Sequence, residues 1–490
     1  MSEPLLQPAG QASGQSAEQP AGQSPGQHAG RAAGAGTVHD VLPQPRREVR
    51  VDYLARVEGE GRLVITLKDR KVEKLVLDIF EPPRFFQGFL VGRHYSEVPE
   101  IVSRICGICP VSHQLTALQA LEVALGVTVS EETRMLRRLL AVAQTFQSHV
   151  LHVYMLALPD YLGYPSVLEM AREESLRPAV ERALRLKKLA NDLTALVGGR
   201  AVHPVTAVVG GFTTVPGRDE VREAQRRLDE VEDDVWKTLR LVAGLELPQL
   251  RRGDMEQVAL FHPQEYPVND GELRSTRGLV ATAATYRAAI EERQVPHSFA
   301  LYSWVRGRGP FLVGPLARVN LNFPRLTLEA RQAAEELGWE FPTDNPFASI
   351  RARALEIQYC WQESRRLLQW YLNRLGELVA SSMRERVKPQ PVNVRAGQGA
   401  AVTEAPRGLL YHAYRLGRDG RVEEADIVSP TAHNVANIQK DLEVFVQDLL
   451  DQPEDITDDE LALKSEMLVR SYDPCISCSV HFLQTDIRRH

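Results

Sequence analysis

The sequence predicts a mainly α-helical protein with small β additions (an α+β class), built as one large helical bundle. Three observations support this prediction: long runs with apolar residues every three or four positions, two short segments with alternating apolar residues, and a composition of 43% hydrophobic and 25% charged residues over 490 positions. The first pattern is typical of helices packed on one face, and the second of half-buried strands. The composition is that of an ordinary globular protein.

The N-terminal segment, residues 1–46, is predicted to be a disordered low-complexity tail. It consists largely of Ala, Gly, Gln, Pro and Ser, and the first aromatic residue of the chain is Tyr53. Such a segment cannot bury enough apolar surface to offset the entropy lost on ordering. We expect residues 47–481 to form a single large domain, followed by a C-terminal extension at 482–490.

Within this domain, each element is predicted from its periodicity. Residues 49–80 alternate, with Leu63, Ile65 and Leu67 on one side and the polar turn KDRK after them, which indicates a hairpin or small sheet. Beyond Pro110 the chain is mostly helical. The helical pattern is clearest at residues 134–156 and recurs near 170–198, 219–245, 270–293 and 347–387. Residues 409–430, with the turn RDGR, predict a second small β segment.

Charge and hydropathy exclude several classes of partner. The net charge of −6 gives no reason to expect binding to nucleic acid or to an anionic membrane. No stretch approaches the roughly 18 apolar residues of a membrane span. The N-terminus shows neither the apolar core of a secretory signal nor a twin-arginine segment, so we expect a cytoplasmic protein.

The five cysteines carry the strongest chemical signal. Four of them form two C-x-x-C pairs, Cys106/Cys109 and Cys475/Cys478, and the fifth, Cys360, lies in a helical run where we expect it to pack as a small apolar residue. Two such pairs supply four thiolates, a set that binds soft or borderline metals. Zinc sites usually join pairs separated by a few tens of residues, whereas these lie several hundred apart. Spacing alone leaves both a structural zinc site and a redox metal open.

The sequences around the cysteines resemble a known family. The matching segments, in family order, are RVEGEG (56–61), RICGICPVSH (104–113), HPVTAVVGGF (203–212), APRG (405–408), VSPTAHN (428–434) and DPCISCSVH (473–481). Together they resemble the large subunit of nickel–iron hydrogenases over about residues 50–481. The segment PRFFQGFLVGR (83–93) is most similar to the cytoplasmic, soluble branch, which includes sulfhydrogenase and NAD(P)-linked α subunits.

The resemblance implies the reaction H2 ⇌ 2 H+ + 2 e− and assigns the metal ligands. Cys106 and Cys475 would be terminal ligands of nickel, and Cys109 and Cys478 would bridge nickel to an iron that carries CO and cyanide. Local sequence agrees with thiolate chemistry, because Pro110 suits the first position of a helix and places Cys109 near its positive end.

Further residues acquire expected roles from the same resemblance. Arg407 would lie over the metals as a fixed hydrogen-bond donor, with Asp473 as a possible ion-pair partner and Thr431 offering a hydroxyl. His113 would lie just behind the metal ligands. Glu58 would accept the proton, with its neighbour Glu60 as the competing candidate.

The end of the chain implies a second metal and a processing step. In the family, the histidine at the position of His481 joins a Mg2+ (or Fe) site with a backbone carbonyl, here Ile427, and an acidic side chain. Gln87 stands where that acid is usual, which is a departure, since an amide oxygen brings less charge. Relatives lose a tail after this histidine to a maturation protease, and we expect cleavage between His481 and Phe482.

Electrons require partner proteins. Only Cys360 remains beyond the four ligands, so the chain cannot hold iron–sulfur clusters through its own cysteines, and it lacks a G-x-G-x-x-G motif after a strand. The resemblance implies an iron–sulfur small subunit and flavin- and NAD(P)-binding subunits.

Three alternatives stay open at this point. They are a non-enzymatic zinc-binding scaffold, a hydrogen-sensing regulatory homologue, and a relative in respiratory complex I. The last has lost the metal-binding cysteines that this chain retains, and sensors commonly lack the removable tail.

Overall fold

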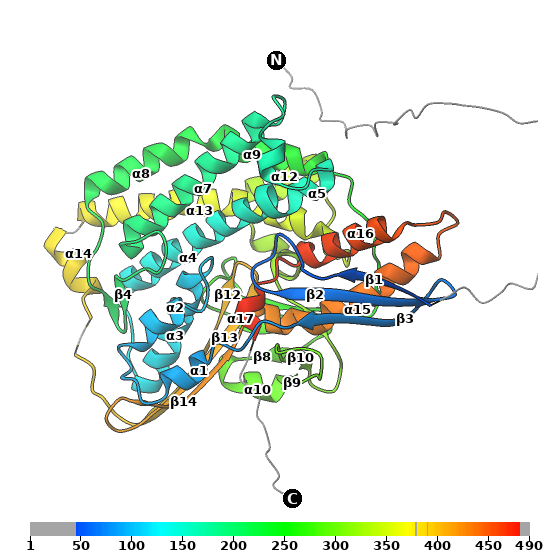
Figure 1. The fold of residues 1–490 in the computed structure, drawn as a ribbon. Helices are drawn as coiled ribbons and strands as arrows, with labels where there is room; N and C mark the ends of the chain where they lie inside the picture. The colour runs from blue at the N-terminus through cyan, green and yellow to red at the C-terminus, as the bar shows by residue number, and fades with distance from the viewer. Residues whose placement is uncertain (1–45, 378–379, 390, 481–490) are drawn as a thin grey trace, which may run out of the picture.

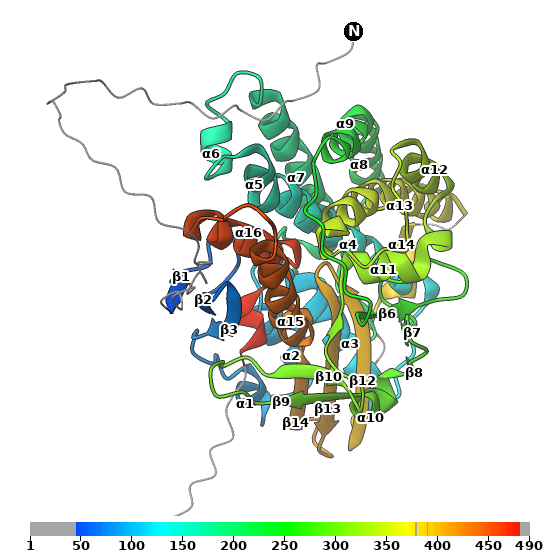
Figure 2. The ribbon, with the colours of Figure 1, turned by 90° about the vertical axis from the view of Figure 1, so that its right-hand side faces the viewer.

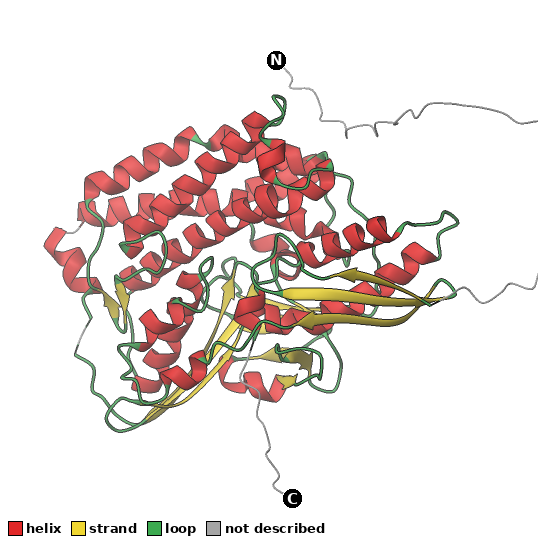
Figure 3. Ribbon diagram, in the orientation of Figure 1, coloured by secondary structure: helices red, strands yellow, loops and turns green. Residues whose placement is uncertain are grey.

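The computed structural model describes residues 46–377, 380–389 and 391–480. The predictions for 1–45, for His481 and for 482–490 lie outside these residues. Helices gather in one half of the molecule and most strands in the other, which confirms the predicted fold class (Figures 1 and 3). Across the described ranges, no helix combines the length and apolarity needed to cross a membrane.

The first sheet is the predicted N-terminal one. It is antiparallel and contains β1 (Arg47–Val51), β2 (Gly61–Lys68) and β3 (Lys71–Ile79). The buried face includes Leu63, Ile65 and Leu67, as the alternation predicts. Both central residues of the β2–β3 turn, Asp69 and Arg70, have positive φ (52° and 60°), the conformation that matches strand twist in a tight hairpin.

The helical bundle forms the other half of the molecule (Figure 1). Its members are α4 (Glu131–Leu151), the π-helical η1 (His152–Ala157), α5 (Leu158–Leu162), α6 (Val167–Met170), α7 (Arg177–Gly198), α8 (Arg218–Glu230), α9 (Glu232–Ala243), α12 (Leu328–Glu336), α13 (Ser349–Glu377) and α14 (Ala380–Val387). Helix α4 begins where the Ser130 hydroxyl accepts a hydrogen bond from Thr133 N, and α4 packs against α7 and α13. The helices predicted near 170–198, 219–245 and 347–387 are confirmed, the second as α8 and α9 and the third as α13 and α14.

The helix predicted near 270–293 is wrong. This segment forms β7 (Glu272–Ser275), β8 (Val280–Ala281), the short 3-10 helix η2 (Ala283–Thr285), α10 (Tyr286–Ala289) and β9 (Ile290–Arg293). Gly271 and Gly278 have φ of 150° and 79°, which no α-helix accommodates. Pairing with β6 (Glu256–Phe261) buries Leu273 opposite Leu260, so tertiary pairing overrides the local pattern.

The second predicted β segment is confirmed, and its sheet contains one strand more than the sequence predicts. β12 (Gly397–Ala405), β13 (Gly408–Leu416) and β14 (Val422–Val428) form an antiparallel sheet, of which the sequence predicted only the last two strands. Helix α3 (Pro110–Leu125) lies directly on it. A Cβ at Gly399 would collide with the backbone of α3, so glycine permits this close approach.

The remaining elements connect these layers. They are α1 (Phe86–Leu90), α2 (Val98–Ser103), β4 (Ala207–Val208), β5 (Gly211–Phe212), β10 (Tyr302–Val305), β11 (Phe311–Leu312), α11 (Pro315–Asn322), η3 (Phe323–Arg325), η4 (Pro346–Ala348), α15 (Pro430–Leu450), α16 (Asp458–Ser471) and α17 (Ile476–Ser479). Helices α15 and α16 pack against the N-terminal sheet (Figure 2). The short helix α17, near the end of the chain, lies centrally between the bundle and the sheets (Figure 1).

Candidate metal centre

The first cysteine pair lies in the loop between α2 and α3. Cys109 occupies the position just before α3, and Pro110 is the first helical residue, as the sequence predicts. The backbone N–H groups of Ile108 and Cys109 donate to Cys106 Sγ at 3.4 and 3.1 Å. These donors stabilise negative charge on that sulfur.

The second pair is held by residues from distant parts of the chain. Cys475 N donates to the Thr431 hydroxyl at 2.8 Å, and Ile476 N donates to the Glu58 carbonyl at 2.7 Å. Glu58 N in turn donates to Pro474 O at 3.3 Å. The segments around Glu58, Thr431 and Cys475 therefore form one backbone-anchored unit.

The four sulfur atoms converge in the interior. Cys106 Sγ lies 3.6 Å from Cys475 Sγ, and a disulfide joins Cys475 to Cys478. Among the described residues, two groups have ligand atoms within 4.8 Å of one another: Cys106, Cys475 and Cys478, and Cys109, His113 and Cys478. None of the four cysteines is more than 8% exposed. Ligation by Cys475 and Cys478 requires thiolates, so the reduced pair is the binding form.

The thiols of the first pair differ in acidity. Hydrogen bonding with Cys109, aided by the positive charge of Arg407, outweighs burial and lowers the pKa of Cys106 to about 7. The same hydrogen bond, together with burial, raises the pKa of Cys109. Cys106 is therefore the thiol of this pair that ionises first.

Buried donors around the sulfurs lack protein partners. In the part of the chain that the structure describes, Arg407 Nη1, Arg84 Nε and His113 Nε2 are buried and form no hydrogen bond. Such donors are costly unless they are satisfied. Four soft sulfurs surrounded by free donors fit a metal group that itself carries acceptor ligands.

Arg407 and Asp473 form the ion pair that the sequence analysis considered. Arg407 Nη2 donates to Asp473 Oδ1 at 3.0 Å and Arg407 Nε donates to the Asp473 carbonyl at 2.7 Å. Burial by itself lowers the pKa of Arg407, but the charges of Asp473, Cys106 and Cys109 outweigh burial and raise it. The guanidinium thus stays protonated and acts as a fixed donor.

His113 lies beside the sulfurs and continues into a chain of rings. Its Nδ1 lies 3.1 Å from His412 Nε2, and His412 Nδ1 lies 2.6 Å from the Tyr414 hydroxyl. Burial, with a contribution from the charge of Arg84, lowers the pKa of His113 to about 3. His113 is therefore a neutral imidazole with one ring nitrogen within 4.8 Å of the Cys109 and Cys478 sulfurs.

Glu58 is better placed than Glu60. Glu58 Oε2 lies 2.9 Å from Cys475 Sγ and accepts a hydrogen bond from Ser477 N at 3.2 Å. Glu60 is exposed, and only its backbone N–H is engaged, with Glu81. Only Glu58 is within one hydrogen bond of a cysteine ligand.

The proposed second metal site is only partly described. Gln87 Nε2 donates to the Ile427 carbonyl at 3.2 Å, so these two residues lie side by side. His481 lies outside the described residues.

Sequence reasoning missed Arg84, which joins the two cysteine loops. Arg84 Nη2 donates to Ile105 O at 2.6 Å and to Ser477 O at 2.7 Å. Each carbonyl belongs to the residue before a cysteine. A single arginine in PRFFQGFLVGR gives no sequence signal for this role.

Comparison with known proteins decides the family. The model for nickel-dependent hydrogenases matches residues 84–182 and 269–481, more than half of the chain. The chain belongs to the nickel-dependent hydrogenase family. Sulfhydrogenase 1 subunit alpha of Pyrococcus furiosus is 36% identical over 440 residues, covering 89% of this hydrogenase chain and 98% of that protein. Sulfhydrogenase 2 subunit alpha of the same organism is 30% identical, covering 89% and 99%.

Solved structures agree with this assignment. An NAD+-reducing [NiFe]-hydrogenase in the H2-reduced state has a TM-score of 0.77 and 27% identity, covering 89% of this hydrogenase chain and 99% of that one. The Ni-Fe-Se hydrogenase from D. vulgaris Hildenborough, at 23% identity and a TM-score of 0.72, shows the shared fold. The chain is thus an oxidoreductase of hydrogen whose cysteines fit nickel and iron, and the zinc-scaffold alternative is set aside.

Proposed function

We propose that this chain is the turnover subunit of a cytoplasmic nickel–iron hydrogenase that exchanges electrons with NAD(P) through partner subunits. The observation that carries the proposal is the convergence of four buried sulfurs, with the Glu58 carboxylate 2.9 Å from Cys475 Sγ. Residues 47–481 act as one catalytic domain. The similarity to sulfhydrogenase alpha subunits and to an NAD+-reducing enzyme supports the choice of acceptor.

Each cysteine has a proposed place on the metals. Cys106 and Cys475 would hold nickel, and Cys109 and Cys478 would be shared between nickel and an iron carrying CO and cyanide. When bound, the metal pair supplies the Lewis acidity and the electron transfer needed to split H2. The 3.6 Å approach of Cys106 and Cys475 sulfurs supports this pairing.

Glu58 handles the proton. Its Oε2 atom accepts a proton from Cys475 Sγ during H2 oxidation and returns it during H2 formation. Ser477 N, 3.2 Å from the same oxygen, holds the carboxylate in place. General acid–base catalysis of this kind requires hydrogen-bond contact with the proton donor, which the 2.9 Å distance provides.

Arg407 and Thr431 organise the surroundings of the metals. The free Nη1 of Arg407 is a donor for a cyanide ligand, while Asp473 fixes the other side of the guanidinium. The Thr431 hydroxyl, which accepts from Cys475 N, can donate its own proton toward the same group. Neutral His113 has one ring nitrogen within 4.8 Å of two of the sulfurs. These residues hold acceptor ligands and exclude water.

Electrons leave through other polypeptides. Only Cys360 remains beyond the four ligands, so an iron–sulfur small subunit and flavin- and NAD(P)-binding subunits complete the enzyme. The sequence similarity to proteins named as alpha subunits supports a hetero-oligomer.

A second metal and a processing step complete the proposal. Mg2+, or a second iron, is held by the Ile427 carbonyl, the Gln87 amide oxygen and His481. This geometry needs a flip of the Gln87 amide, whose nitrogen now donates to Ile427 O. A maturation protease removes residues 482–490 once the metals are in place, as expected for an enzyme that turns over and not for a sensor.

One infrared spectrum of the complex, purified with its partners, tests the proposal. CO and cyanide ligands absorb in a window free of protein bands, so both sets of bands should appear, together with nickel and with iron in excess over nickel, because the partner subunits add iron–sulfur clusters. Zinc in place of nickel, or no bands from a nickel-loaded complex, would refute the proposed centre. Intact mass of the same sample tests the cleavage after His481.

A further inference from the structure

Arg407 lies in a tight turn beside the cysteine cluster. It lies with Pro406 in the two-residue connection between β12 and β13, whose last pair is Ala405 opposite Gly408. Its side chain reaches the sulfurs from this turn, and Nη1 has no protein partner. The distance from that nitrogen to a metal ligand therefore depends on where the backbone of the turn sits.

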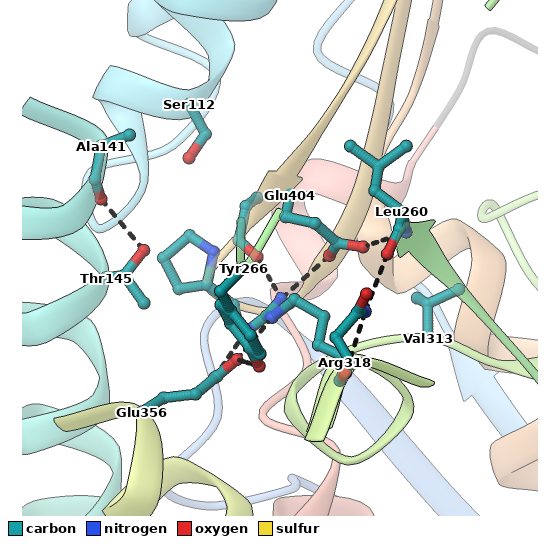
Figure 4. A network of polar contacts seen from close by, with 12 residues as sticks. Ser112, Ala141, Thr145, Leu260, Tyr266, Val313, Arg318, Glu356 and Glu404 are labelled. Carbon is teal, nitrogen blue, oxygen red and sulfur yellow. Dashed lines mark hydrogen bonds and ion pairs between the residues drawn. The ribbon is translucent and has the colours of Figure 1, made fainter. Parts of the chain in front are cut away.

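A second buried arginine forms hydrogen bonds to the backbone of this turn. Arg318, on α11 and 2% exposed, donates through Nη1 to the Ala405 carbonyl at 2.7 Å and through Nη2 to the Pro406 carbonyl at 2.9 Å. Nη1 also donates to Glu404 Oε2 at 3.0 Å. One guanidinium thus holds three consecutive residues that lead into Arg407. Figure 4 shows Arg318 between Glu404 and Glu356.

Arg318 is itself fixed from α13. Its Nε and Nη2 donate to the two carboxylate oxygens of Glu356, both at 2.7 Å. Glu356 accepts a hydrogen bond from the Tyr266 hydroxyl at 2.5 Å, and its other oxygen lies 2.7 Å from His149 Nε2. The planar guanidinium of Arg318 is therefore fixed in orientation, because all three of its nitrogens donate hydrogen bonds.

The other side of the turn is closed by the segment just before α11. Gly314 has φ of 120°, and a Cβ there would lie 2.9 Å from the Arg407 carbonyl oxygen. Val313, the preceding residue, is tied to Asn434, whose Oδ1 accepts from Val313 N at 2.8 Å and whose Nδ2 donates to Val313 O at 3.1 Å. The segment from Val313 to Arg318 thus contacts the turn from two directions.

We propose that Arg318, held by Glu356, is a positioning residue for Arg407: it sets the turn that aims the free Arg407 nitrogen at the metal centre. This inference rests on the proposed function, because it assumes that Arg407 donates to a ligand of the iron. The hydrogen bonds of Arg318 within the described residues go to Glu356, Glu404 and the two carbonyls of the turn and not to a sulfur, so its proposed effect is exerted through Arg407.

Two changes test this in the complex purified with its partner subunits. Arg318→Lys keeps the charge but cannot bond both carbonyls and both Glu356 oxygens. The double variant Arg318→Met with Glu356→Gln removes the two charges together, which buried pairs tolerate better than loss of one partner. We expect normal nickel and iron content, shifted cyanide and CO infrared bands, and a kcat lowered about 10- to 100-fold with little change in the KM for H2, because misplacement of a donor by about 1 Å has effects of this size.

The matched control is Arg137→Lys. Arg137 is also buried, also pairs with both oxygens of a carboxylate, Glu122, and also donates to a backbone carbonyl, that of Val208. Its bands and kcat should match those of the unchanged enzyme, even if its thermal stability falls.

The outcomes separate the two proposals. An unchanged enzyme without CO and cyanide bands refutes the proposed centre. Normal bands in the unchanged enzyme and in either Arg318 variant refute the positioning role. Loss of metal from the variants, with unshifted bands in the fraction that keeps it, also refutes it, because Arg318 would then serve folding alone.

Discussion

Two buried polar regions of this hydrogenase subunit meet at the turn that carries Arg407 and differ in one respect. Around the four sulfurs, buried polar atoms lack partners: Arg407 Nη1, Asp473 Oδ2, Arg84 Nε and His113 Nε2. In the neighbouring cluster of Arg318, Glu356, Glu404 and Tyr266, every buried side-chain polar atom among the described residues has a partner. The first region is built to receive a group, and the second is already complete.

The difference shows how the site is made precise. Donors without a protein partner can bind a ligand, but no hydrogen bond fixes their position before the ligand is bound. The complete cluster supplies the rigidity that the open one lacks, and Arg318 transmits it to the turn of Arg407. An open site supported by a saturated one is the arrangement expected for preorganised chemistry.

The largest effect should come from replacing one of the four cysteines. Cys475→Ser replaces a soft sulfur ligand of the C-terminal cysteine pair with a hydroxyl. The complex should therefore lose nickel and all hydrogenase activity, as measured by metal analysis and H2 evolution. Cys360→Ala is the control, since Cys360 is buried on α13 and belongs to neither group of converging ligand atoms among the described residues. Nickel retained at full occupancy in the Cys475 variant would contradict the proposed ligand set.

A smaller effect is expected at Glu58. Glu58→Gln keeps the shape but cannot take a proton, so kcat should fall about 10²- to 10⁴-fold while nickel and iron content stay normal. Glu60→Gln, an exposed neighbour, should leave kcat unchanged. Equal losses in both variants, or none in either, would rule out Glu58 as the proton acceptor.

The complete cluster can be broken by removing one charge. Burial by itself raises the pKa of Glu356, but the charge and hydrogen bonds of Arg318 and His149 outweigh it and lower the pKa to about 2. An acid with a depressed folded pKa stabilises the protein above its unfolded pKa of about 4.3, and this contribution is lost as pH falls toward 2.

Glu356→Gln should therefore cost about 3–5 kcal/mol at pH 7, since it leaves Arg318 buried without its main counter-charge. The difference in thermal unfolding midpoint between the variant and the unchanged complex should shrink as pH falls below about 4. A gap that stays constant with pH would show that the charge of Glu356 does not contribute.

Much of the open site could be predicted from sequence, and little of the complete one. The cysteines, Glu58 and Arg407 stand in local motifs with distinctive spacing, so their neighbours in sequence reveal them. Arg318, Glu356 and Glu404 come from three separate elements, and each looks like an ordinary charged residue until the fold buries it. The same limit explains the wrong helix at 270–293, where strand pairing with β6 decides the structure.

The smallest effect is expected at Gln87. Gln87→Ala removes one hydrogen bond to Ile427 O and should cost about 0.5–1.5 kcal/mol in stability. Gln87→Glu restores the acid usual in the family and should raise bound Mg2+ by metal analysis, because a carboxylate is the stronger ligand. Unchanged Mg2+ in the Glu variant would argue against a cation at this position.

X-ray absorption at the nickel and iron edges of the purified complex tests the central claim most directly. If sulfurs from both ends of the chain share one bimetallic centre, nickel should have a shell dominated by sulfur with iron as its next metal neighbour, and iron should show both sulfur and light-atom ligands. Nickel surrounded by nitrogen and oxygen atoms, or nickel and iron with no mutual neighbour, would contradict the account.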